Sequence, residues 1–173
     1  EEARGAGSES RKKLNVLGFL SNISPEKGIF DFLDLMAAIE ARGLPVEGNI
    51  AGPFQDEDVE QRVRERLSRL PDVHYLGPVY GDDKESFYAS LDAFLFPTRY
   101  TNEAEPLVLH EAMMHALPVI AFGRGAIPEI VPDAGGHVVD KDEPFVPAAL
   151  EQISLWYSDP ATFISSSRSA RQA

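Results

Sequence analysis

Hydrophobic and polar positions alternate along this chain in short blocks that glycine, proline or polar clusters separate. Brief apolar runs of strand length predict buried strands at residues 14–20, 45–51, 73–76, 92–96, 118–121 and 137–139. Apolar residues at helical spacing predict helices at residues 27–42, 56–70, 84–90, 107–115 and 147–157, and a helical turn at 127–131. Residues 161–173 either continue as a helix or fray.

Strands that alternate with helices predict an α/β protein with a Rossmann-like open parallel sheet, covered by helices on both faces. With 173 residues, the chain is long enough for one domain with a buried core. Residues 1–13 are polar and lack any period, which predicts a disordered tail or an interdomain linker. We therefore expect a folded domain at residues 14–160 and a C-terminal helix or tail at residues 161–173.

Charge and composition exclude several classes of function. The formal net charge of −12 argues against binding to nucleic acid, because a phosphate backbone requires a basic surface. The chain has no cysteine, so disulfide and thiolate chemistry are excluded, and this composition is typical of a reducing cytoplasm. No apolar stretch approaches the roughly 18 residues that span a bilayer, so we expect no transmembrane segment.

The candidate chemistry gathers at one edge of the predicted sheet. In open parallel sheets, ligands bind at the carboxyl ends of the strands, where the following loops lead into helices. That edge holds the loop before Lys27, the turn after Leu76, and residues 100–106 and 123–125. Free N–H groups and the positive end of the dipole at helix N-termini attract phosphate, so we expect a phosphate-bearing ligand here.

Two glutamates, Glu103 and Glu111, have seven residues between them, with Glu103 in a loop and Glu111 about one turn into the next helix. A buried strand, a Gly-Arg-Gly turn and Pro128-Glu129 follow. This run resembles the Glu-x7-Glu signature of retaining, nucleotide-sugar-dependent glycosyltransferases of the GT-B architecture, similar to glycosyltransferase family 4. Lys27-Gly28 is similar to the Lys-Gly element after the first strand of that family's donor-binding domain.

The resemblance extends over residues 14–157 and covers only the C-terminal, donor-binding half of a two-domain enzyme. It implies retaining glycosyl transfer from a UDP- or GDP-sugar to a saccharide or lipid-linked acceptor, without a cofactor or an obligatory metal. The implied partner is the N-terminal acceptor-binding domain, which has no counterpart in this sequence. We expect a cytoplasmic location, with any peripheral attachment to a membrane supplied by the missing half.

The resemblance also implies roles for individual residues. Lys27 would contact the donor diphosphate, and Glu103 would orient the transferred sugar; these two are the catalytic candidates. Glu111 would accept hydrogen bonds from the ribose diol. The backbone of Tyr75 or Leu76 would meet the edge of the base, while their side chains are expected in the core. Position alone leaves other interpretations open, since Lys27 could be a solvated lysine and Glu111 a partner of the helix dipole.

This sequence departs from the family at two places. Asn22 occupies the position of the arginine five residues before the family's lysine, so either Asn22 bonds to the ligand or Arg99 or Arg124 replaces that charge. The family's glycine between the glutamates is absent. In its place the sugar-facing loop has Glu105, Pro106 and Leu107, of which the proline has no N–H to offer.

These departures favour an alternative, a non-catalytic nucleotide-binding or regulatory module on the same fold. The intact Lys27, Glu103 and Glu111 favour the transferase. A phosphorylase or a sugar epimerase would lack its own motif. Asp56 and Asp58 form an Asp-x-Asp pair, a metal signature elsewhere, but here they begin a charged helix, where acids complement the dipole. The histidines are scattered, and we predict no metal site.

Overall fold

A single parallel sheet organises the molecule, and the computed structural model describes it over residues 10–103 and 106–173. The predictions for residues 1–9 and for Glu105 lie outside the described residues. The sheet has the strand order β3-β2-β1-β4-β5-β6, and every neighbouring pair is parallel. The strands are β1 (Val16–Leu20), β2 (Glu47–Ala51), β3 (Val73–Tyr75), β4 (Ala93–Phe96), β5 (Val119–Phe122) and β6 (Gly136–Val139).

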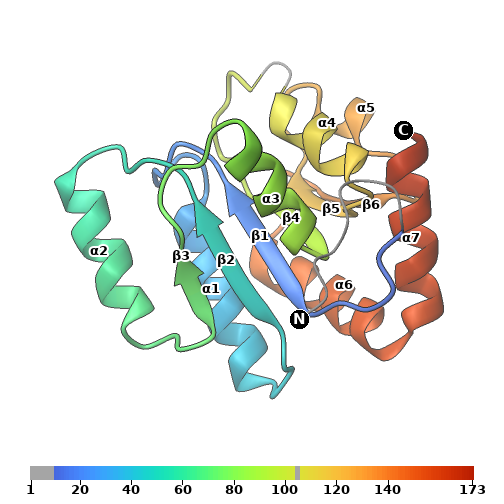
Figure 1. Ribbon diagram of the computed structural model, residues 1–173, viewed down its shortest axis with the longest axis horizontal. Coiled ribbons are helices and arrows are strands. Elements are labelled where there is room, and N and C mark those ends of the chain that lie inside the picture. The colour runs from blue at the N-terminus through green and yellow to red at the C-terminus, as the bar shows by residue number, and fades with distance from the viewer. Residues whose placement is uncertain (1–9, 104–105) are drawn as a thin grey trace.

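Helices cover both faces of this sheet, as expected from the alternation along the chain. They are α1 (Ile29–Ala41), α2 (Glu57–Leu67), α3 (Asp82–Ser90), α4 (Leu107–Met114), α5 (Ile127–Ile130), α6 (Phe145–Ser158) and α7 (Pro160–Gln172). In Figure 1, α3 and α4 lie in front of the sheet, while α1 and α6 lie behind it. The predicted fold class, a Rossmann-like α/β domain, is confirmed.

The core is divided by the sheet into two apolar clusters, because successive strand side chains point to opposite faces. Leu17 of β1 and Leu95 of β4 pack toward α1 and α6, whereas Leu20 and Phe94 pack toward α3 and α4. Strands buried on both faces explain why their sequences are continuous apolar runs rather than alternating ones.

The ends of the elements follow local chemistry. Asp56 caps α2, and its carboxylate accepts a hydrogen bond of 2.8 Å from the N–H of Val59. Asp159 caps α7 in the same way, accepting from the N–H of Thr162 at 3.3 Å. Residues 161–173, for which the sequence left a helix or a frayed end open, are helical up to Gln172. None of the helices in the described part of the chain has both the length and the hydrophobicity needed to cross a membrane.

Candidate functional site

Lys27 and Glu103 meet where the sheet reverses its strand order. The strands β1 and β4 are neighbours, although one connects onward to β2 and the other to β5, which makes this position the topological switch point. Lys27 follows β1 and Glu103 follows β4. Their side chains form an ion pair, with 2.7 Å between Nζ of Lys27 and Oε2 of Glu103. The side chain of Glu103 is 11% exposed and that of Lys27 is 25% exposed, so the ion pair is largely buried at the carboxyl edge of the sheet.

Close packing explains why glycine follows Lys27. Gly28 has φ of 87°, and a Cβ at this position would overlap the carbonyl oxygen of Pro97 at the end of β4. The backbone N–H of Lys27 donates to Oγ of Ser24 at 3.2 Å. Its ammonium also lies 4.7 Å from the centre of the Tyr100 ring, a cation–π contact. The Lys-Gly element therefore brings the start of α1 against the loop after β4.

Glu103 is fixed from two further directions. Buried Thr98 donates its hydroxyl to Oε2 of Glu103 at 3.1 Å. The turn after β5 lies against the backbone of Glu103, where Gly125 has φ of 52° and a Cβ would overlap the Glu103 carbonyl oxygen. Segments that follow β1, β4 and β5 thus meet at Glu103: Lys27 and Thr98 bond to its carboxylate, and Gly125 packs on its backbone carbonyl. Pro106 is buried just before α4, and Leu107 at the start of α4 is exposed.

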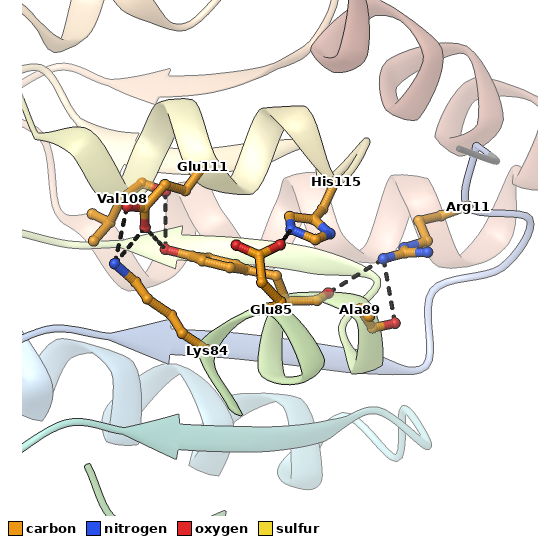
Figure 2. Close-up of polar contacts among 8 residues, drawn as sticks. Arg11, Lys84, Glu85, Ala89, Val108, Glu111 and His115 are labelled. Atoms are coloured by element: carbon orange, nitrogen blue, oxygen red, sulfur yellow. Dashed lines mark hydrogen bonds and ion pairs between the residues drawn. The ribbon is translucent and has the colours of Figure 1, made fainter. Parts of the chain in front are cut away.

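Glu111 is held by α3 rather than by Lys27. The hydroxyl of Tyr88 donates to Oε2 at 2.7 Å, and Nζ of Lys84 lies 2.7 Å from Oε2 and 2.9 Å from Oε1. Figure 2 shows Lys84 and Glu111 pointing toward one another. Burial, together with the hydrogen bond to Glu111, raises the pKa of Tyr88, so its phenol stays protonated and acts as the donor.

Sequence reasoning did not identify Lys84 and Tyr88 as site residues. The signal available was their spacing of four residues in a predicted helix, which places two side chains on one helix face. That spacing indicates a shared face but not which element the face contacts. The contact between this face of α3 and Glu111 of α4 depends on the tertiary structure, so the sequence pattern alone does not predict it.

At the end of β3, the expectation that both side chains lie in the core holds for Tyr75 and fails for Leu76. Tyr75 is partly buried against the core, and its hydroxyl donates to the Gly52 carbonyl at 2.7 Å. The prediction that the Leu76 side chain is core is wrong, because it lies one residue beyond the strand and is 52% exposed. The N–H of Leu76 donates to the Ile50 carbonyl at 2.9 Å.

Of the two arginines considered as replacements at the Asn22 position, Arg99 already has a partner. Its guanidinium makes two hydrogen bonds of 2.8 Å to the carboxylate of Asp31 on α1. Nε of Arg124, in the turn after β5, is buried and has no hydrogen-bond partner among the described residues. Asn22 itself is exposed.

The structure places Asp56 at the start of a charged helix, as predicted, and shows in addition that it is the N-cap of α2. Its carboxylate is engaged by the first turn of α2, and the hydrogen bond from Val59 lowers the pKa of Asp56. Within residues 10–103 and 106–173, no three histidine or acidic side chains are arranged to hold a metal ion.

A parallel sheet in this strand order, with a lysine and a glutamate meeting at its switch point, defines the Rossmann-like class of ligand-binding domains. The family model described as glycosyl transferases group 1 matches residues 14–158, and the chain belongs to this family. The resemblance inferred from Lys27, Glu103 and Glu111 is confirmed at the level of the family.

Two curated relatives illustrate the relationship. The chain is 35% identical over 127 residues to the sulfoquinovosyl transferase SQD2 of Arabidopsis thaliana, covering 66% of this chain and 23% of that protein. It is 32% identical over 132 residues to the D-rhamnosyltransferase WbpZ of Pseudomonas aeruginosa, covering 75% of this chain and 32% of that protein. The chain therefore spans a third or less of the length of these relatives.

Solved structures agree on the fold. The C-terminal domain of a glycosyl transferase group 1 family protein (LpcC) from Francisella tularensis superposes with a TM-score of 0.76 at 19% identity, covering 94% of this chain and 85% of that one. HepE from Anabaena, in complex with UDP and glucose, gives a TM-score of 0.79 at 20% identity, covering 92% and 43%. The fold is that of the C-terminal domain of the GT-B architecture.

Proposed function

We propose that this chain is the donor-binding half of a retaining glycosyltransferase, which transfers a sugar from a UDP- or GDP-sugar to a saccharide or lipid-linked acceptor. Membership of the group 1 family supports the reaction class, and the HepE complexes with UDP-glucose support the donor class. The observation that carries the proposal is the Lys27–Glu103 pair at the switch point, because ligands of this fold bind there.

The donor diphosphate would lie at the N-terminus of α1. Lys27 would exchange the carboxylate of Glu103 for a phosphate oxygen, and the dipole of the 13-residue helix would add positive charge. Charge that develops on the leaving diphosphate is stabilised best by groups already in place. These groups reduce the need for a metal ion, so we propose a reaction without an obligatory one.

The two glutamates would divide the rest of the donor. Glu103, released from Lys27 but still held by Thr98, would accept hydrogen bonds from hydroxyls of the transferred sugar. Glu111 would accept from the two ribose hydroxyls, a geometry for which a carboxylate has enough lone pairs. The sugar would transfer with retained configuration, by front-face attack through an oxocarbenium-like transition state, once an acceptor domain closes the cleft.

The base and the sugar loop complete the proposed site. Tyr75 and Leu76 would lie beside the base, and the exposed side chain of Leu76 would offer the base an apolar surface. In the loop after β4, Pro106 has no N–H to donate, and Glu105 would instead accept hydrogen bonds from the sugar hydroxyls, with Leu107 next to it. Asn22 would bond to a phosphate oxygen.

We further propose that Arg124 supplies the positive charge that the family's arginine would otherwise bring. It lies in the turn that packs against Glu103, and the buried Nε still has bonding capacity among the described residues. Arg99 is the weaker candidate because breaking its bidentate pair with Asp31 would cost two charge-assisted hydrogen bonds.

The second candidate, a nucleotide-binding module without catalysis, is favoured by one observation. Asn22 is exposed and uncharged where the family has arginine, which weakens stabilisation of a leaving diphosphate. The two functions differ after an acceptor domain is joined to the chain, because only the transferase then transfers sugar.

Saturation-transfer NMR with UDP-, GDP- and ADP-sugars tests the proposal directly. We expect one nucleotide series to bind in EDTA, and Lys27→Met to remove most of the signal. Lys12→Met is the matched control, since Lys12 is exposed on the N-terminal segment and the change in charge is the same. Absence of binding to every donor, or binding only with magnesium, would contradict the site as proposed.

A further inference from the structure

Helix α3 holds the carboxylate of Glu111 through two donors of different character. Tyr88 is fully buried, and its hydroxyl lies 2.7 Å from Oε2 and 3.4 Å from the carbonyl oxygen of Val108. Lys84 is 30% exposed and approaches both carboxylate oxygens from one turn earlier in the helix. One donor therefore belongs to the core and the other to the surface.

The ring of Tyr88 is locked in place by its neighbours. It stacks on His115 with 5.3 Å between ring centres and an interplanar angle of 21°, and it packs against Phe94 at 5.8 Å. The guanidinium of Arg11 donates to the backbone carbonyls of Tyr88 and Ala89 at 3.2 and 3.3 Å. Figure 2 shows Arg11 facing Ala89. The hydroxyl of Tyr88 is thus presented from a fixed backbone and a fixed ring.

The numbers of donors and acceptors assign different roles to the two residues. A carboxylate has about four acceptor positions, and a vicinal diol occupies two of them. Tyr88 occupies one from the buried side, where no ligand can replace it. Lys84 occupies the outer positions, and its partly exposed ammonium can leave them for solvent at little cost.

We propose that Tyr88 is a positioning residue that aims the Glu111 carboxylate at a ribose diol, and that Lys84 is the exchangeable counter-ion of the empty site. The inference rests on the proposed function, in which Glu111 binds ribose. It adds that the Tyr88 hydroxyl determines how strongly the site distinguishes a ribonucleotide from a 2′-deoxyribonucleotide, because only the first offers both hydroxyls to an oriented carboxylate.

Calorimetry on the full 173-residue chain tests this with UDP and 2′-deoxy-UDP, and with GDP and 2′-deoxy-GDP in parallel. We expect the parent to prefer the ribonucleotide by about tenfold or more, as the loss of a charge-assisted hydrogen bond predicts. Tyr88→Phe retains the stacked ring but should remove most of that preference, leaving affinity for the deoxynucleotide within about twofold of the parent. Lys84→Met should keep the preference at the parent level or above it.

Two matched controls change side chains that make no hydrogen bond to Glu111 among the described residues. Glu85→Gln changes a carboxylate on the same helix, one that is 2.8 Å from Nε2 of His115. Tyr157→Phe removes a hydroxyl from α6, which packs on the other face of the sheet. Both should preserve the preference for ribose, whereas Glu111→Gln should abolish it.

The outcomes separate the two proposals. Failure of the parent to bind any nucleotide would overturn the proposed function, and the role of Tyr88 with it. Binding with an unchanged preference in Tyr88→Phe, or an equal loss for both nucleotides, would overturn the positioning role alone. If Tyr88→Phe does not fold, Lys84→Met decides the matter, because a preference lost in that variant would make Lys84 the positioning group.

Discussion

Replacing Lys27 with methionine should separate ligand binding from folding. The substitution keeps the hydrocarbon of the side chain and removes the ammonium that lies 2.7 Å from Glu103. Glu103 then retains the hydrogen bond from Thr98 and its own partial access to water. The largely buried Glu103 carboxylate therefore keeps a hydrogen-bond donor in the variant.

The expected loss of folding free energy depends on how exposed the Lys27–Glu103 ion pair is. Because the lysine is a quarter exposed, solvent screening limits the pair to roughly 1 kcal/mol of folding free energy. For a domain of this size, that corresponds to a Tm lower by about 2–4 °C. The diphosphate loses a charge-assisted contact of about 1.5–3 kcal/mol, or roughly ten- to more than a hundredfold in affinity.

Isothermal titration calorimetry with the best-binding nucleoside diphosphate measures the loss of affinity, and differential scanning calorimetry measures the change in Tm. Lys12→Met controls for the change in net charge. An affinity within about threefold of the parent would refute the placement of the diphosphate beside Lys27. A Tm loss much larger than expected would show that the pair serves the fold instead.

Other expectations concern the glutamates, the last helix and the isolated domain. Glu111→Gln should weaken binding of free nucleotide, whereas Glu103→Gln should reduce only the extra affinity that the sugar adds; equal losses of free nucleotide in calorimetry would contradict these roles. Hydrogen bonds from Thr162 lower the pKa of Asp159 below its ordinary value of 3.8. The cap should therefore stabilise α7 fully at pH values above 3.8, and this stabilisation should be lost as the pH falls through the lowered pKa. Amide exchange in α7 should thus be faster in Asp159→Ala than in the parent at neutral pH, and the difference should disappear in strong acid. In a radiolabelled-donor assay, the isolated chain should transfer essentially no sugar until an N-terminal acceptor domain is joined, and robust transfer without it would contradict the half-enzyme proposal.

Local patterns were sufficient to predict most of the fold. Buried parallel strands are short apolar runs, and here each run became a strand within a few residues of its predicted ends. The acidic residues from Asp56 correctly indicated the start of α2. The sequence left residues 161–173 open although Asp159 caps α7 locally, and the tertiary contact of buried Phe163 with the Trp156 ring stabilises this helix further.

The candidate site was predicted in its outline and missed in its contacts. Strand order alone brings Lys27 and Glu103 to one edge, and their direct pairing is what the sequence did not specify. The partners of Glu111 were missed because a helical repeat shows which residues share a face but not what that face meets. Leu76 was misjudged because a strand that ends one residue early turns an apolar position outward.

The contact between Gly125 and Glu103 affects how this domain can be re-engineered. The loop after β4 and the turn after β5 touch through a glycine Cα and a carbonyl oxygen, with no space for a side chain between them. A loop after β4 grafted from another family member would keep its shape only if its partner turn came with it. The two segments, distant in sequence, therefore form one exchangeable cassette, and chimaeras that divide it between two parents should lose the geometry of both.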